Sequence, residues 1–411
     1  MLSPELHTLP NGLRVLLLHY PGQPVTHCGL MIKAGTRDEP VGQEGMAHFI
    51  EHCLFKGTKT RKSFHILNRL EVIGGELNAY TTKEETCVHA SVLRPHLERA
   101  LELIADVCMH SIFPDKEIEK EKDVIVDEIL SYQDTPYEQI FDDFENIVFN
   151  GHKLGTPILG TEQSIRKFKR SQLVNFVKEN YLPSQMILVI SGDHQNKEVV
   201  KLAETYFNSK SKGKSAQERK AFKSFRPAVK EEKRNTSQVH YISGRPALSM
   251  HHPNRYNLVL LNNILGGPGM NSKLNLNIRE KYGFTYTIES GYHAYTDSGI
   301  FHVYFATDRK NFEKARKLVQ NEFDKLCTKP INSRVFSQYK EQLKGQIAIA
   351  QENRLSLMLS IGKGLMNFNR IILPDEVMTR IEAVTATGVQ QAAQDFLGDN
   401  KVSSLTFVPL S

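Results

Sequence analysis

Residues 45–61 read GMAHFIEHCLFKGTKTR, and the pentapeptide HFIEH at 48–52 is the most informative part of the chain. If this stretch is helical, His48 and His52 project from one face because they are four residues apart. Two imidazoles at this spacing can share one Zn²⁺ ion. Glu51 reaches the same face, where a carboxylate can serve as general base for zinc-bound water. Taken alone, the motif leaves open the alternative that both histidines are structural.

A second predicted helix offers the third protein ligand that a tetrahedral catalytic zinc site requires. This helix covers residues 116–132, with Asp115 as its N-cap. Glu121 and Glu128 lie two turns apart on it, on a face that also contains Ile125. A charged pair on either side of an isoleucine is unusual on a solvated helix face and is typical of a buried polar site. Most other glutamates of this run are expected on the surface.

The segments around these helices alternate between strand and helix patterns. Asn11-Gly12 marks the turn of a hairpin over residues 6–19, and Gly74-Gly75 ends a helix. The other predicted strands cover residues 25–33, 77–82, 86–92 and 186–191, and the other predicted helices cover residues 44–55, 63–73, 96–110, 172–181 and 197–207. This order of elements predicts an α+β fold.

The stretch 208–234 is rich in Lys and Ser and poor in branched aliphatic residues, which is typical of a linker between domains. The two halves that it separates are similar in length. Residues 164–192 and 380–409 also share an order of short helix, amphipathic helix and strand. We therefore predict two homologous domains, 1–207 and 235–411, each a mainly antiparallel sheet packed against helices. Two unrelated α/β domains are the alternative.

Composition adds limits on partners and compartment. The 411 residues include 52 Lys+Arg and 46 Asp+Glu, a net charge of +6. The basic linker accounts for this excess, and the usual nucleic-acid-binding motifs are missing, so we expect neither a nucleic acid nor an anionic surface as partner. The five cysteines are far apart and form no CxxC motif, which favours a reducing compartment. With no secretory signal pattern and no run of 18 apolar residues, we expect a cytoplasmic protein that does not bind a membrane.

The chain resembles a known family in three places: the stretch 45–61, the sequence GGELNAYTTKEET at 74–86, and the helix with Glu121 and Glu128. These are the inverted-motif zinc peptidases, or inverzincins, which include pitrilysin, insulin-degrading enzyme and mitochondrial processing peptidase. The resemblance covers nearly the whole chain and is to the short, two-domain, processing-peptidase-like type. It implies a metalloendopeptidase with one Zn²⁺ per chain.

The resemblance also assigns roles to the residues of the motif. His48, His52 and Glu128 match the zinc ligands of the family, and Glu51 matches its general base. Glu121 matches a second glutamate, which supports the site and is not usually a direct ligand.

Two further pairs of residues match the family outside this motif. Asn78-Ala79 stand where the family has an edge strand beside the zinc, to which the substrate backbone adds as an extra strand. A role of Asn78 in shaping a turn is the alternative. In LGGPGMNSKLNLNIREKYGFTYTIESG (265–291), Arg279 and Tyr286 match a pair that holds the substrate carbonyl near the transition state. The second half contains no HxxEH motif and therefore resembles an inactive repeat.

The resemblance implies peptides or unfolded polypeptide segments as substrates. Long relatives contain four such domains and this chain two, so pairing of two chains is implied. Because one chain contains both the zinc half and the Arg/Tyr half, we expect a homodimer. The alternative within the same fold is a non-catalytic or partner-dependent subunit. Such subunits lose zinc ligands or the base, and all of these are present here.

Overall fold

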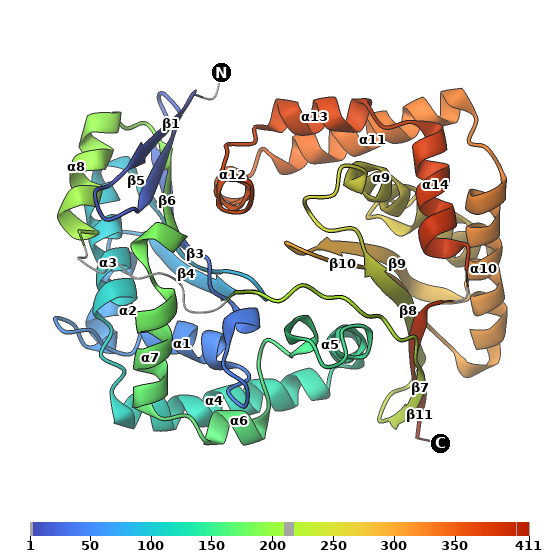
Figure 1. The fold of residues 1–411 in the computed structure, drawn as a ribbon, viewed down its shortest axis with the longest axis horizontal. Helices are drawn as coiled ribbons and strands as arrows, with labels where there is room; N and C mark the ends of the chain where they lie inside the picture. The colour runs from blue at the N-terminus through green and yellow to red at the C-terminus, as the bar shows by residue number, and fades with distance from the viewer. Residues whose placement is uncertain (1–2, 209–217, 400, 411) are drawn as a thin grey trace. The chain divides into compact units, whose positions relative to one another are not determined.

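The computed structural model describes residues 3–208, 218–399 and 401–410, which form two compact units (Figure 1). The first unit consists of Met1–Ile129, Thr156–Arg219 and Ala350–Ile372, and the second consists of Leu130–Gly155, Lys220–Ile349 and Leu373–Ser411. Each unit contains one sheet, packed against helices around its own hydrophobic core. The predicted α+β fold class is therefore confirmed.

The first sheet has six strands in the order β1-β2-β6-β3-β5-β4. The strands are β1 (Ser3–Thr8), β2 (Arg14–His19), β3 (Val25–Ile32), β4 (Glu76–Thr81), β5 (Thr86–Leu93) and β6 (Met186–Gly192). β2 pairs in parallel with β6, and all other neighbours are antiparallel. The predicted hairpin forms β1 and β2. Among the residues that the structure describes, β4 pairs only with β5 and is therefore an edge strand.

Helices cover both faces of this sheet, which explains why β6 is buried along its whole length. Successive side chains of a strand point to opposite faces. Leu188 and Ile190 belong to the main core of the unit, whereas Val189 faces α12 on the other side. The helices of the first unit are α1 (Met46–Leu54), α2 (Ser63–Glu71), α3 (Leu97–His110), α4 (Asp115–Gln133), α6 (Glu162–Arg166), α7 (Arg170–Asn180), α8 (Asn196–Tyr206) and α12 (Arg354–Phe368).

The second sheet repeats the topology of five strands of the first. Its order is β7-β11-β8-β10-β9, and it matches β2-β6-β3-β5-β4 strand for strand, including the single parallel pair. The strands are β7 (Val229–Arg234), β8 (Val239–Ala247), β9 (Thr285–Ala294), β10 (Gly299–Thr307) and β11 (Ser403–Pro409). The helices of this unit are α5 (Pro136–Val148), α9 (Arg255–Gly266), α10 (Phe312–Thr328), α11 (Ser333–Ala350), α13 (Pro374–Glu382) and α14 (Ala386–Leu397). The same topology in both units is what a duplicated domain produces.

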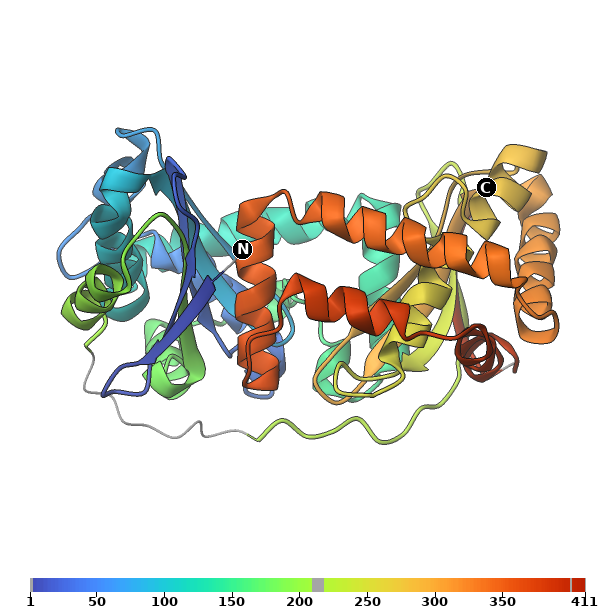
Figure 2. The same cartoon turned by 90° about the horizontal axis from the view of Figure 1, so that it is seen from above.

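One helix from each half of the chain packs on the sheet of the other half. α5 contacts β8 and β11 of the second sheet, and α12 contacts β3 and β6 of the first, as Figure 2 shows for α12. Gly362 permits this close approach, because a Cβ there would lie 2.6 Å from Met31 Sδ and 2.7 Å from Val189 Cγ2. The compact units therefore differ from the contiguous halves 1–207 and 235–411, since they exchange α5 and α12.

The range predicted as a linker, 208–234, needs a correction at its C-terminal end. Val229–Arg234 forms β7, which pairs with β11. Arg219 is also anchored, because its Nε and Nη2 donate hydrogen bonds to the carboxylate of Asp38 at 2.9 and 2.8 Å. Both contacts show that this basic segment contributes a strand and an ion pair to the fold, so it is not a linker along its whole length. Residues 209–217 lie outside the described residues.

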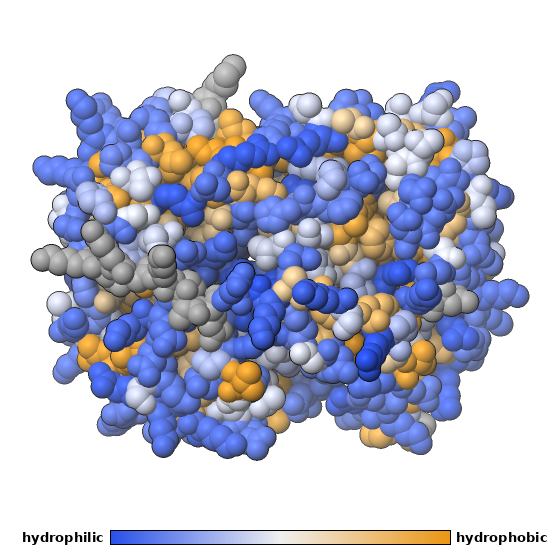
Figure 3. All heavy atoms as spheres, viewed as in Figure 1, coloured by the Kyte–Doolittle hydropathy of each residue, from blue (hydrophilic) through white to orange (hydrophobic). Residues whose placement is uncertain are grey.

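Within the described residues, no helix is both long enough and apolar enough to cross a lipid bilayer. On the face drawn in Figure 3, hydrophilic residues dominate and hydrophobic side chains occur in separate groups.

Candidate metal centre

The helix that carries the HFIEH motif is fixed at its N-terminus. Gly45 caps α1 with φ +88°, a left-handed conformation that favours glycine, and a Cβ there would lie 2.5 Å from the carbonyl oxygen of Leu159. The Glu39 carboxylate accepts hydrogen bonds from the backbone N–H groups of Gly45 and Ala47 at 3.0 and 2.9 Å. A carboxylate at this position satisfies free N–H groups and complements the helix dipole. These contacts define the direction in which the motif projects.

His48, His52 and Glu128 form the one group of at least three His, Cys, Asp or Glu side chains, among those described, that could hold a metal ion. Their donor atoms all lie within 4.8 Å of one another. Nε2 of His48 is 3.9 Å from Oε1 of Glu128, and Nε2 of His52 is 3.7 Å from Oε2. The structure therefore brings together the three residues that the resemblance predicted as zinc ligands.

The chemistry and spacing of these donors fit zinc. Zn²⁺ binds imidazole nitrogen and carboxylate oxygen at about 2.0–2.2 Å, so the ligands of a tetrahedral site are about 3.4 Å apart. The two separations between a histidine nitrogen and a Glu128 oxygen, 3.9 and 3.7 Å, exceed this by a few tenths of an ångström. Three protein donors also leave the fourth position open, as catalytic zinc sites require.

The two histidines differ in their electrostatic environment. Burial, and then the neighbouring His52, lower the pKa of His48 to about 3, so this ring stays neutral, the form that binds metal. Burial also lowers the pKa of His52. However, the hydrogen bond with Glu121 and the charge of Glu128 outweigh burial and place this pKa above its usual value. Nδ1 of His48 is buried without a hydrogen-bond partner among the described residues, so an orienting partner is found only for His52.

Glu121 is the orienting partner of His52. Its Oε2 is 3.3 Å from Nδ1 of His52, and its Oε1 is 2.7 Å from Nζ of Lys56. Burial works to raise the pKa of Glu121, but its bonds to His52 and Lys56 prevail, so this pKa lies below its usual value. Glu121 is therefore a charged acceptor on the ring nitrogen of His52 that faces away from Glu128, the position that orients a metal-binding histidine.

Glu51 lies on the same helix face and is not part of the donor cluster. Thr81 of β4 donates a hydrogen bond from Oγ1 to Oε2 of Glu51 at 2.5 Å. Burial raises the pKa of Glu51, although the bond from Thr81 and the charge of His52 act in the other direction. A carboxylate with a raised pKa, beside a potential metal site, is suited to accept and return a proton.

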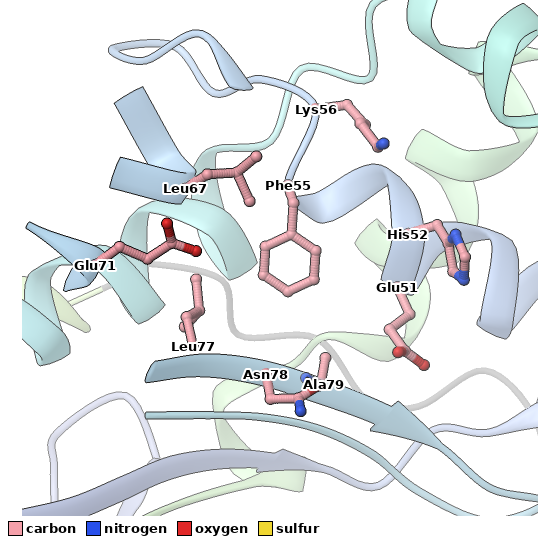
Figure 4. Close-up of a pocket in the computed structure, with 9 residues that line it drawn as sticks. All are labelled: Glu51, His52, Phe55, Lys56, Leu67, Glu71, Leu77, Asn78 and Ala79. Atoms are coloured by element: carbon pink, nitrogen blue, oxygen red, sulfur yellow. Dashed lines mark hydrogen bonds between the residues drawn. The ribbon is translucent and has the colours of Figure 1, made fainter. Parts of the chain in front are cut away.

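A cavity of about 280 Å³ opens between Glu51 and the edge strand β4 (Figure 4). Asn78 and Ala79 of β4 line it together with Glu51 and His52. The predicted edge strand therefore lies beside these two residues. The full lining is Glu51, His52, Phe55, Lys56, Leu67, Glu71, Leu77, Asn78 and Ala79. Oδ1 of Asn78 accepts a hydrogen bond from the N–H of Ala79 at 2.8 Å. Asn78 lies within a strand here and does not form a turn.

The other two predicted site residues lie in the second unit. Arg279 belongs to a π-helical segment, Asn275–Glu280, and Tyr286 lies near the start of β9. The side chain of Arg279 is 40% exposed, and Tyr286 is 82% exposed. Both can therefore donate hydrogen bonds to a bound molecule.

Sequence reasoning missed two residues that contact the candidate site. Thr81 donates a hydrogen bond to Glu51, and Lys56 forms an ion pair with Glu121. Lys56 lies four residues after His52, just beyond the end of α1, so its spacing places it near the histidine but does not identify Glu121 as its partner. Thr81 has no comparable local signal, since its contact depends on how β4 packs against α1.

Comparisons with known proteins extend over most of the chain. Residues 14–162 match the family described as "Insulinase (Peptidase family M16)", and residues 167–343 match "Peptidase M16 inactive domain". A Bacillus subtilis (strain 168) protein named "Uncharacterized zinc protease YmxG" is 32% identical over 400 residues, which are 97% of each chain. A Rickettsia bellii (strain RML369-C) protein named "Uncharacterized zinc protease" is 33% identical over 405 residues, 97% of this chain and 96% of the relative.

Two crystal structures share the fold. One is a protease from Helicobacter pylori, with a TM-score of 0.90 and 20% identity over 100% of both chains. The other is a peptidase M16 inactive domain from Pseudomonas fluorescens, with a TM-score of 0.91 and 19% identity over 100% of this chain and 98% of that one. Both likenesses extend over the two sheets and their helices.

Proposed function

The chain belongs to the insulinase family, peptidase family M16, and from this premise we propose that it is a zinc-dependent endopeptidase. We propose peptides or unfolded polypeptide segments as its substrates. The observation that carries the proposal is the cluster of His48, His52 and Glu128, with the Glu51 carboxylate on the same helix face. The names of the relatives, which call them zinc proteases, support the same function.

Each residue of the cluster has a role in this proposal. His48, His52 and Glu128 would hold the zinc ion, with Glu121 orienting His52. A zinc ion bound there supplies a Lewis acid that acidifies water and polarises a carbonyl group. Glu51 removes a proton from the attacking water and later returns it to the leaving amine. Thr81 holds the Glu51 carboxylate in place for both transfers.

The edge strand β4 provides the substrate-binding element of the proposal. Its outer edge has no strand partner among the described residues, and its residues Asn78 and Ala79 line the cavity next to Glu51. An extended peptide that pairs with this edge gains main-chain hydrogen bonds without a strict sequence requirement. Such binding suits unfolded segments, because a folded domain does not expose its backbone in extended form.

We further propose that Arg279 and Tyr286 stabilise the developing oxyanion through their guanidinium and phenol donors. Their exposure in the second unit supports this role. We propose a homodimer in which the second unit of one chain completes the zinc site of its partner.

The ligand set can be tested by metal analysis. We expect purified protein to contain one zinc per chain, and His48→Ala and Glu128→Ala to lose most of it together with peptide hydrolysis. Glu119→Ala is a matched control, because Glu119 lies on the same helix as Glu128 and is exposed. Unchanged zinc content in either ligand variant, with folding verified by circular dichroism, would remove that residue from the set.

A further inference from the structure

The cavity beside Glu51 is polar at its two ends and apolar between them. Figure 4 shows the Glu51 carboxylate at one end and the Glu71 carboxylate pointing inward from the other. The Phe55 ring lies between them, with Leu67 and Leu77 nearby. A volume of about 280 Å³ is near the lower limit for small-molecule pockets, which suits a single side chain.

The carboxylate of Glu71 is exposed and has no hydrogen bond or ion pair with any described residue. Lys56, which lines the same cavity, and Arg69, two residues before Glu71, both have other partners. Nζ of Lys56 lies 2.7 Å from Glu121, and Nη2 of Arg69 lies 3.2 Å from Glu102. The far end of the cavity therefore has an uncompensated negative charge.

The position of Glu71 on its helix strengthens this charge. Glu71 is the last residue of α2, where the carbonyl end of the helix dipole is negative. An acidic residue there is unfavourable for helix stability. It adds to the negative potential that a bound cation would experience, so the site favours a positively charged group from outside.

The apolar stretch before Glu71 matches a long aliphatic chain. Leu67 and Glu71 are four residues apart on α2 and therefore face the same side, and Leu67 is 50% exposed. Lysine and arginine place an aliphatic stem on apolar surface and leave the charged group at a polar end. An acidic side chain would meet Glu71 with like charge.

We infer that Glu71 is a specificity-determining residue that selects lysine or arginine next to the scissile bond of the substrate. This inference rests on the proposed peptidase function, since the cavity begins at Glu51 and lies along β4. The stem of the substrate side chain contacts Phe55, Leu67 and Leu77, and its cationic group pairs with Glu71.

The test compares peptides that differ only in one residue beside the cleaved bond. Lysine is compared with norleucine, which keeps the aliphatic stem and lacks the amine. We expect the wild type to have a kcat/KM up to about fivefold higher for lysine, the range of an exposed ion pair. Glu71→Gln should bring this ratio to about one, and Glu71→Lys should invert the preference between lysine and glutamate.

Glu5→Gln is the matched control, because Glu5 is an exposed acid on β1, at the opposite edge of the same sheet. It should keep the preference for lysine. Glu71→Gln should unfold at the same or a higher temperature than wild type, since it removes an acid from a helix C-terminus. The inference fails if no position beside the cleaved bond shows a preference for a basic residue that Glu71→Gln removes.

A binding measurement separates this inference from the proposed function. Fluorescence anisotropy with labelled lysine and norleucine peptides can be recorded on Glu51→Gln and on the double variant Glu51→Gln/Glu71→Gln. Tighter lysine binding that is lost in the double variant would support the inference even if the wild type hydrolyses nothing. Hydrolysis by the wild type with equal binding of both peptides would overturn the inference and leave the proposed function intact.

Discussion

The Glu51 carboxylate experiences two opposing influences. Burial favours its neutral form, and the hydrogen bond from Thr81 favours its charged form. A general base must be ionised before it accepts a proton. Thr81 therefore orients the carboxylate and favours its charged form.

Thr81→Val removes this hydroxyl and keeps the branched shape that suits a strand. A hydrogen bond to a charged group contributes about 1.5–3 kcal/mol, so we expect kcat to fall roughly tenfold to a hundredfold with little change in KM. Thr81→Ser, which retains the hydroxyl, should keep most of the activity. Steady-state kinetics on one peptide can measure this, and equal kcat values for Thr81→Val and wild type would contradict the assigned role.

The spacing of residues was enough to predict part of this site and not the rest. His48, Glu51 and His52 share a helix face by their spacing alone, and Glu121 and Glu128 share another face. The contact of Thr81 with Glu51 and the ion pair of Lys56 with Glu121 could not be predicted in this way. They depend on how α1 meets β4 and α4, which a local pattern does not encode.

The elements themselves were largely predictable, but their packing partners were not. The hairpin of β1 and β2 follows from Asn11-Gly12 and its apolar flanks, and the helix–helix–strand order of α6, α7 and β6 returns in α13, α14 and β11. The sequence pattern contains no comparable signal for the exchange of α5 and α12 between the two halves of the chain. An amphipathic helix shows that one face is buried and does not show which sheet covers it.

Asp143 on the exchanged helix α5 makes the contact with β7 sensitive to pH. Burial raises its pKa to about 6, against the charge of Arg234, whose Nη2 is 3.3 Å away. Glu232 and Asp142 also act to raise this pKa, and Lys230 acts to lower it. The folded state holds this proton more tightly than the unfolded state does. The protonated carboxyl of Asp143 therefore stabilises the folded state below the ordinary pKa of the group, and this stabilisation is lost as pH rises through about 6.

Asp143→Asn should remove this dependence. The difference in urea midpoint, variant minus wild type, should be larger at pH 7.5 than at pH 4.5. Only the wild type loses this stabilisation between the two pH values. Glu138→Gln changes an exposed residue on the same helix. Its urea midpoint should differ from that of the wild type by the same amount at both pH values. An Asp143→Asn difference that is the same at both pH values would contradict the assignment.

At the scale of the whole molecule, the two units have the same sheet topology but different chemistry. α1 in the first unit carries HFIEH, whereas α9, which has the corresponding place between β8 and β9, reads RYNLVLLNNILG and has no histidine or acid. Only the first unit can therefore build this metal site. The second unit instead presents Arg279 and Tyr286, for which we propose a role in the site of a partner chain.

The proposed homodimer can be tested by complementation. Glu51→Gln and Tyr286→Phe proteins, each of low activity alone, are mixed under conditions that allow subunits to exchange. If the site is shared between chains, the mixed dimer contains one intact site and activity returns. If exchange is confirmed by mass spectrometry and activity stays low, the site is completed within one chain.

The most direct test of the central claim is the zinc content and the peptide hydrolysis rate of Glu51→Gln beside the wild type. The proposed chemistry predicts that both proteins retain about one zinc per chain, and that hydrolysis by the variant falls by a factor of about a hundred or more. A variant that holds zinc and cleaves peptides at the wild-type rate would contradict it.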